Sequence, residues 1–168
     1  AYLIFQTNTM EKSKFQFEFE AYDQLEKLPG LDKKLINKAI ETAKKAYAPY
    51  SSFNVGAAVL LDNNEIIAGN NQENAAYPSG LCAERVALFY ANANFPDKKV
   101  KAIAIVAMKD GELIDHVVTP CGNCRQAMLE TELRFNSPIR IIMGGKNGFW
   151  AVPKAQYMLP LSFTGDSL

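Results

Sequence analysis

Apolar side chains recur at intervals of three and four residues in three stretches of the chain, and this spacing predicts three amphipathic helices. The stretches cover residues 32–47, residues 82–94, and the run from the sequence TPCGNC to about residue 135. Asp32 is a candidate N-cap for the first helix, and Pro49 stands just beyond it, where a proline ends a helix.

Shorter apolar runs predict strands between these helices. Two of them, 53–61 and 65–70, flank the turn-forming sequence Asp62-Asn63-Asn64, which is typical of a β-hairpin. Further strands are predicted at residues 100–108, 138–145 and 148–152, with a short extended piece at 112–118. Strands before, between and after helices indicate an α/β fold, a three-layer sandwich whose mixed central sheet is flanked by helices.

The first thirty residues are an addition to this pattern. Phe15, Phe17 and Phe19 alternate with polar residues in the sequence KFQFEFEAY, which predicts one extra, half-buried strand. We therefore expect an N-terminal extension over residues 1–30 and a single domain over residues 31–168.

Composition narrows the range of partners. Lys and Arg together number 18, as do Asp and Glu, so the balanced charge argues against a nucleic-acid backbone as the main partner. No apolar run approaches the ~20 residues that span a bilayer, and the opening sequence AYLIFQTNTM lacks the features of a secretory signal. Three cysteines, an odd number, favour free thiols or a metal, and therefore a cytoplasmic location.

All three cysteines stand at the starts of predicted helices. Cys82 opens the second helix, and Cys121 and Cys124 open the third within PCGNC. Helix N-termini stabilise thiolates, so neighbouring helix ends would let the three sulfurs converge on one Zn²⁺. Three alternatives stay open: Cys82 as a buried apolar residue, CGNC as a redox dithiol, and a structural zinc site closed by His116. Three thiolates with an open fourth position is the preferred interpretation, because catalytic zinc keeps a position for water.

Three polar residues near the cysteines are candidates for supporting chemistry. Glu84 follows Cys82 by two residues and could exchange protons with metal-activated water, although a first-turn acid can also simply interact with the helix dipole. Arg85 could donate to the thiolates and offset their excess negative charge, or lie on the surface. Gln126 could be a further donor behind the metal ligands, or an exposed helix residue.

The sequences CAER and PCGNCRQ together resemble the cytidine deaminases of the small, all-cysteine zinc type. YAPYSSFNVGAA, GNNQENAAY and LPLSF are similar to further family segments in the same order, so the resemblance extends from about Leu31 to Phe163. It implies the deaminase sandwich, one Zn²⁺ per chain, and a homotetramer whose active sites are shared between subunits. The implied reaction is hydrolytic deamination of cytidine, and of deoxycytidine, to uridine or deoxyuridine and ammonia in pyrimidine salvage.

The resemblance also implies roles for individual residues. Cys82, Cys121 and Cys124 would hold the zinc, and Glu84 would carry protons between water, the base and the departing amine. The nucleoside would contact five residues: Asn71 and Glu73 at the ribose, the main chain of Ala83 at the base edge, Phe53 beside the ring, and Phe163 from a neighbouring subunit. Taken singly, the same residues suit a turn, the core or a tail anchor.

Rival functions share parts of this pattern. A deaminase of another aminopyrimidine would use the same zinc chemistry, but NQENAAY resembles the ribose-binding segment of the cytidine enzymes. A zinc-stabilised interaction module without activity would have no use for Glu84 beside the metal. An editor of tRNA or single-stranded DNA would need a basic and aromatic surface, which the balanced charge disfavours.

Overall fold

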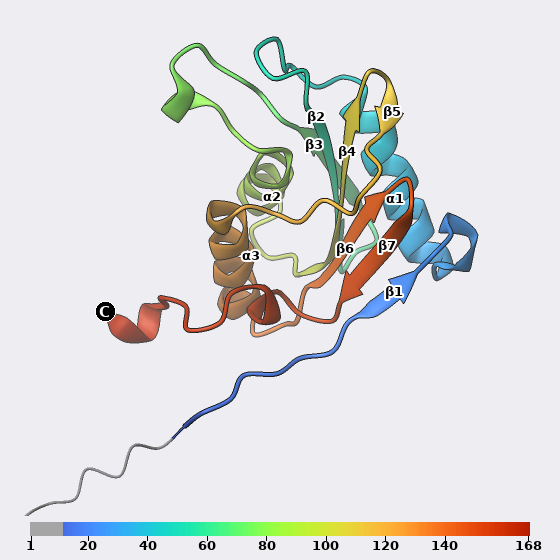
Figure 1. Cartoon of the computed structure of the whole chain (residues 1–168). Coiled ribbons are helices and arrows are strands. Elements are labelled where there is room, and N and C mark those ends of the chain that lie inside the picture. Colours follow the sequence, from blue (N-terminus) through green and yellow to red (C-terminus); the bar gives the residue numbers. More distant parts are fainter. Residues whose placement is uncertain (1–11) are drawn as a thin grey trace, which may run out of the picture.

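The computed structural model describes residues 12–168, which form one sheet with helices on both of its faces (Figure 1). The helices are α1 (Gly30–Ala43), α2 (Ala83–Asn94) and α3 (Gly122–Phe135). The strands are β1 (Glu20–Tyr22), β2 (Asn54–Leu61), β3 (Ile66–Asn70), β4 (Val100–Lys109), β5 (Glu112–Leu113), β6 (Arg140–Gly145) and β7 (Gly148–Val152). Short 3₁₀ turns are η1 (Leu25–Lys27), η2 (Tyr77–Ser79), η3 (Ala155–Met158) and η4 (Gly165–Ser167).

The sheet is mixed, as predicted. Its strand order is β1-β7-β6-β4-β2-β3, and β5 pairs with β4. Strands β4 and β6 are parallel and are connected through α3, whereas β2–β3 and β6–β7 are antiparallel hairpins. The parallel pair is therefore the one whose connection needs a helix, because parallel neighbours cannot be joined by a tight turn.

Helices cover both faces of the sheet, which confirms the predicted three-layer sandwich. Along β2, Ala57, Val59 and Leu61 pack in the cluster that contains α2 and α3, while Ala58 and Leu60 pack in the cluster that contains α1. The alternation follows from the two-residue period of a strand, and burial on both faces explains why β2 reads as a continuous apolar run. None of the helices in residues 12–168 has both the length and the apolarity to cross a membrane.

Two glycines set how closely the helices approach the sheet. A Cβ atom at Gly56 in β2 would lie 2.0 Å from the carbonyl oxygen of Ala39 in α1. A Cβ atom at Gly69 in β3 would lie 2.6 Å from the backbone nitrogen of Ala87 in α2. Both helices therefore lie directly on strand backbone. This contact fixes the distance between the sheet and α2, whose N-cap residue is Cys82.

The predicted bounds of the first helix were wrong at both ends. The helix begins at Gly30 after Pro29, so Asp32 lies in its first turn and is not the N-cap. Asp32 is buried, and its carboxylate accepts a hydrogen bond of 2.9 Å from Arg140 at the start of β6. The helix ends at Ala43, and Tyr47 lies beyond it in an isolated bridge to Gln72.

The N-terminal strand is much shorter than its alternating sequence predicts. Only Glu20–Tyr22 pairs, with residues 149–151 of β7, whereas Phe15, Phe17 and Phe19 lie outside the strand and are 52%, 38% and 47% exposed. The register places Phe19 beside the last residue of β7, after which Pro153 follows, so the segment has no strand to pair with. The phenylalanines instead contact the rings of Tyr157 and Trp150. The piece at 112–118 is likewise a strand only at Glu112–Leu113.

Candidate active site

The three cysteine sulfurs converge because the N-termini of α2 and α3 lie side by side. Cys82 and Cys121 occupy the N-cap positions of the two helices, with extended backbone, and Cys124 lies in the first turn of α3. The sulfur of Cys121 is 4.0 Å from that of Cys82 and 3.6 Å from that of Cys124. Sulfurs bound about 2.3 Å from one tetrahedral ion lie about 3.8 Å apart, so the cluster fits a Zn²⁺ ion.

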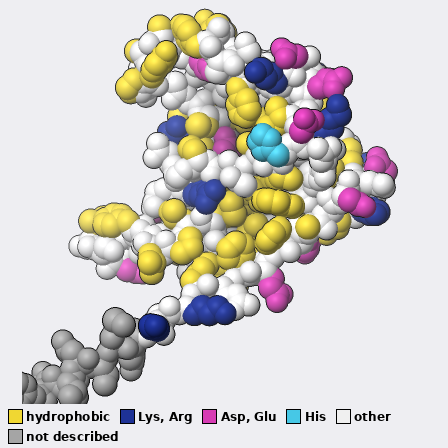
Figure 2. All heavy atoms as spheres, in the orientation of Figure 1, with side chains coloured by type: hydrophobic (Ala, Val, Ile, Leu, Met, Phe, Trp, Pro, Cys, Tyr) yellow, Lys and Arg dark blue, Asp and Glu magenta, His cyan; other side chains and the backbone are white. Residues whose placement is uncertain are grey.

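His116 does not join this cluster. Within residues 12–168, the cysteine triad is the group of thiol, imidazole or carboxylate ligands with a metal-binding arrangement, and its ligand atoms lie within 4.8 Å of one another. The chain's single histidine is exposed at the surface (Figure 2, cyan). Three protein ligands leave a fourth position for water, which is the arrangement of catalytic rather than structural zinc.

The environment of Cys82 favours the thiolate form of this residue. A hydrogen bond from Cys124 and the nearby Arg85 guanidinium lower the pKa of Cys82 to about 5. Arg85 approaches the Cys82 sulfur with a nitrogen at 3.8 Å. Hydrogen bonding to the Cys82 sulfur and burial raise the pKa of Cys124, so these two thiols share one proton, which a metal ion would displace.

Glu84 is a buried carboxylate on the turn that follows Cys82. It is 5% exposed, and it packs at the start of α2. Burial raises the pKa of the Glu84 carboxyl, and the adjacent Cys82 thiolate raises it further. A raised pKa brings the protonated form of the carboxyl within easier reach, which suits Glu84 to exchange protons as a general acid–base.

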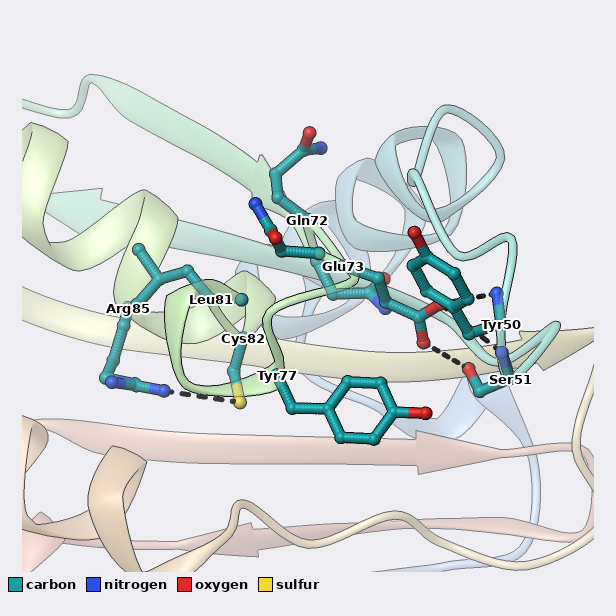
Figure 3. A pocket seen from close by; sticks show the side chains of 11 residues that line it. Tyr50, Ser51, Gln72, Glu73, Tyr77, Leu81, Cys82 and Arg85 are labelled. Atoms are coloured by element: carbon teal, nitrogen blue, oxygen red, sulfur yellow. Dashed lines mark hydrogen bonds between the residues drawn. The ribbon is translucent and has the colours of Figure 1, made fainter.

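A cavity of about 490 Å³ extends away from Cys82 (Figure 3). Its volume lies within the range of small-molecule sites. Cys82 and Arg85 line one end, and Tyr50, Ser51 and Glu73 line the other, with Tyr77 between them. The remaining lining residues are Asn71, Gln72, Asn74, Gly80 and Leu81.

The residues predicted to bind ribose are held by the loop that precedes β2. The Glu73 carboxylate accepts the backbone N–H groups of Tyr50 at 2.9 Å and Ser51 at 3.3 Å, and also the Ser51 hydroxyl. The Asn71 amide accepts the Val55 N–H at 2.7 Å and donates to the Phe53 carbonyl at 2.9 Å. Asn71 and Glu73 therefore bring their loop and residues 50–55 together around the cavity.

The other predicted substrate-binding residues do not line the cavity. Ala83 is buried beside Cys82, and Phe53 is half-buried and does not line the cavity. Phe163 is 61% exposed and lies on a separate groove beside α3. Gln126 does not serve the sulfurs as predicted, because its amide donates to the Phe163 carbonyl at 3.0 Å.

Sequence reasoning missed Arg125, which holds the loop before Cys121. Its guanidinium donates to the carbonyl of Pro120 at 2.7 Å, the carbonyl of Met158 at 3.0 Å and the hydroxyl of Thr119 at 3.3 Å. The position of Arg125 directly after Cys124 was the one signal in the sequence that could have indicated a role near the metal site. Its hydrogen-bond partners could not be predicted, because tertiary structure brings Met158 to it.

Comparison with known proteins agrees with this geometry. Residues 29–135 match the family model described as the cytidine and deoxycytidylate deaminase zinc-binding region. A cytidine deaminase of Halalkalibacterium halodurans is 36% identical over 134 residues, which cover 80% of this chain and 95% of that protein. A cytidine deaminase of Mycobacterium tuberculosis is 38% identical over 67% of this chain and 84% of its own length. The crystal structure of cytidine deaminase from Burkholderia pseudomallei superposes with a TM-score of 0.65 at 37% identity, covering 77% of this chain and 97% of that one.

The sandwich and its thiol cluster therefore define a zinc-dependent deaminase fold. The chain belongs to the cytidine and deoxycytidylate deaminase family, and the family's zinc-binding region together with the cysteine triad assigns one zinc ion to each chain.

Proposed function

We propose that the chain catalyses the hydrolytic deamination of cytidine, and of deoxycytidine, with Cys82, Cys121 and Cys124 as zinc ligands. The observation that carries this proposal is the buried Glu84 carboxyl next to Cys82 and Cys124, within a cluster of three convergent thiols of which Cys82 lines a cavity of nucleoside size. The named relatives, which are cytidine deaminases, support the same reaction.

Each residue has a distinct task in this mechanism. Zinc, when bound, acts as a Lewis acid that lowers the pKa of water. Glu84 accepts the proton released by the attacking water, protonates N3 of the cytosine, and passes a proton to the amine that leaves as ammonia. Arg85 offsets the excess negative charge of three thiolates on a divalent ion. Asn71 and Glu73 bind the sugar hydroxyls, and the main chain of Ala83 contacts the base edge. Phe53, which the sequence predicted beside the ring, lies outside the cavity lining and supports it through backbone hydrogen bonds to Ser51 and Asn71.

A nucleoside fits the cavity better than its 5′-monophosphate. Arg85 is the one cationic side chain among the residues that line the described cavity, and it is directed at Cys82. The opposite end carries the Glu73 carboxylate, which would repel a phosphate. We therefore expect turnover of cytidine and deoxycytidine and little turnover of dCMP.

Assembly as a homotetramer with shared active sites is part of the proposal. Several large apolar side chains near the cavity and in the C-terminal segment are exposed, including Tyr47, Tyr50, Tyr77, Leu161 and Phe163. Exposed apolar residues in such number favour burial against another chain. Phe163 lies outside its own chain's cavity, as a residue contributed to a neighbour would. Residues 31–168 form the catalytic domain in this proposal, residues 1–30 an extension, and the free thiols suit a cytoplasmic enzyme of pyrimidine salvage.

The test is a spectrophotometric assay of the purified protein that follows loss of the cytosine chromophore, with metal analysis and light scattering on the same sample. Turnover of cytidine with about one zinc per chain supports the reaction. Zinc without turnover of cytidine, deoxycytidine or dCMP would refute it and leave another aminopyrimidine as substrate. A monodisperse monomer that is fully active would refute shared active sites.

A further inference from the structure

Ser51 links Glu73 to the backbone of Phe53 at the end of the cavity opposite Cys82. Its hydroxyl donates to the Glu73 carboxylate (Figure 3). The same hydroxyl accepts the backbone N–H of Phe53 at 3.0 Å. A hydroxyl has one proton and can accept two hydrogen bonds, so both contacts are made at once. The Phe53 N–H, the Ser51 hydroxyl and the Glu73 carboxylate thus form one continuous chain of hydrogen bonds.

The Phe53 peptide is held on both sides by this arrangement. Ser51 accepts its N–H, and Asn71 donates to its carbonyl at 2.9 Å. Two backbone hydrogen bonds also join the loop before β2 to residues 71–73. The Glu73 N–H donates to the Tyr47 carbonyl, and the Tyr47 N–H donates to the Asn71 carbonyl. Phe53 and the two residues proposed to bind the sugar, Asn71 and Glu73, therefore belong to one hydrogen-bonded unit.

The number of hydrogen bonds at Glu73 defines what it can offer a substrate. A carboxylate has about four acceptor positions, and three are taken by Tyr50 N–H, Ser51 N–H and the Ser51 hydroxyl. These donors also lower the pKa of the Glu73 carboxyl, with the Ser51 hydroxyl as the largest cause, which keeps it an acceptor at neutral pH. One acceptor position remains, and its direction is set by the three that are filled.

We propose that Ser51 is a positioning residue for the nucleoside: its hydroxyl orients the free acceptor position of Glu73 toward a sugar hydroxyl, and its hydrogen bond to the Phe53 N–H holds Ser51 itself in place. The inference rests on the proposed function. It assigns Ser51 no contact with the reacting atoms, so its loss should weaken sugar-dependent binding more than the chemical step.

The test compares Ser51→Ala, Ser51→Thr and the matched control Ser52→Ala in the full chain. Ser52 is exposed, lies in the same loop, and makes no side-chain hydrogen bond within residues 12–168. We expect KM for cytidine to rise about tenfold or more in Ser51→Ala, the effect of losing a hydrogen bond to a charged group. kcat should change by less than about threefold, Ser51→Thr should restore the wild-type KM, and Ser52→Ala should match the wild type.

A second substrate separates positioning from general damage to the loop. The ratio of kcat/KM for cytidine to that for 2′,3′-dideoxycytidine measures what the sugar hydroxyls contribute, and Ser51→Ala should lower this ratio about tenfold. Equal losses on both substrates, or a Ser51→Ala enzyme that matches Ser52→Ala, would overturn the role of Ser51. Wild-type protein without cytidine turnover would instead overturn the proposed function. Circular dichroism and zinc content check that each variant is folded, and Ser51→Thr against wild type provides the comparison if Ser51→Ala does not fold.

Discussion

Glu132 is a buried carboxylate whose removal should lower the free energy of unfolding substantially. It is 7% exposed, and it lies in α3 near the end away from the cysteines. Its oxygens accept three backbone N–H groups: Ile139 at 2.8 Å, Ala155 at 2.7 Å and Gln156 at 3.1 Å. One side chain therefore holds both the approach to β6 and the first turn of η3 against the helix.

The magnitude follows from the groups left behind. In Glu132→Ala, the N–H groups of Ile139 and Ala155 lose their partner in a buried setting. Each buried donor without a partner costs about 1–3 kcal/mol, which gives a loss of roughly 2–6 kcal/mol in the free energy of unfolding. Glu132→Gln keeps one oxygen acceptor and should cost about 1–2 kcal/mol. The larger loss is a substantial part of the roughly 5–15 kcal/mol that stabilises a typical domain.

Urea unfolding followed by circular dichroism, at fixed zinc concentration, measures these differences. Glu130→Ala is the matched control, because Glu130 is an exposed acid on the same helix with no hydrogen bond or ion pair in the described part of the chain. It should change the free energy of unfolding by about 0.5 kcal/mol or less. A Glu132→Ala variant within about 1 kcal/mol of this control would refute the reasoning, since two buried donors cannot lose their acceptor at so small a cost.

Other perturbations follow from the same structure. Glu84→Gln should keep about one zinc per chain but lose about 100-fold or more in kcat, and undiminished turnover in the cytidine assay would remove its role as proton carrier. Cys124→Ser should lower both zinc content and melting temperature, because zinc binding is coupled to folding; metal analysis showing full zinc would contradict the ligand assignment. Hydrogen bonds from Arg140 lower the pKa of Glu20 from 4.5 to about 2. The Glu20 carboxylate therefore stabilises the folded protein above pH 4.5, and this contribution is lost as the pH falls toward 2. Urea unfolding at several pH values should therefore show Glu20→Gln less stable than wild type at neutral pH and equal to it near pH 2, and a constant difference would contradict this assignment. Gly56→Ala should destabilise by roughly 3 kcal/mol or more, because its Cβ would lie 2.0 Å from a backbone oxygen of α1, whereas Gly30→Ala meets nothing within 4 Å and is the control in a melting experiment.

Local sequence rules predicted that the three cysteines stand at helix starts, and one tertiary assumption was needed to bring them together as a metal centre. Cys82 and Cys121 follow Gly80-Leu81 and Thr119-Pro120, where the chain cannot yet be helical, and each becomes an N-cap. A CxxC spacing then brings Cys124 one turn further along the same helix face. These features depend on neighbours within a few residues, so periodicity and helix-start signals could identify them. The side-by-side placement of the two helix ends was the one tertiary assumption, and the packing of α2 and α3 on the same face of the sheet satisfies it.

The prediction failed where a side chain depends on distant residues. Asp32 has the chemistry of an N-cap, but its carboxylate binds Arg140, which is 108 residues away. Gln126 stands next to the cysteines in sequence, yet its amide binds the Phe163 carbonyl, 37 residues further on. In both cases a charged or amide group has several possible partners of equal chemical quality, and only the packed fold selects one.

The end of the cavity formed by Glu73 and Ser51, where we propose that the sugar binds, also depends on residues far apart in the sequence. Glu73 and Ser51 are 22 residues apart, and they meet because β2 and β3 pair with Gly56 opposite Asn70. Side chains alternate between faces of a strand, so a slip of one residue in this pairing would turn those of β3 to the opposite face. The register is fixed by Gly56 and Gly69, which lie directly beneath the backbones of α1 and α2. If either strand slipped, a residue with a side chain would take the place of the glycine, and its Cβ atom would clash with the helix backbone. The same close packing that positions α2, with Cys82 at its N-terminus, therefore sets where Glu73 meets Ser51. The sheet in this way couples the Cys82 end of the cavity to the end formed by Ser51 and Glu73.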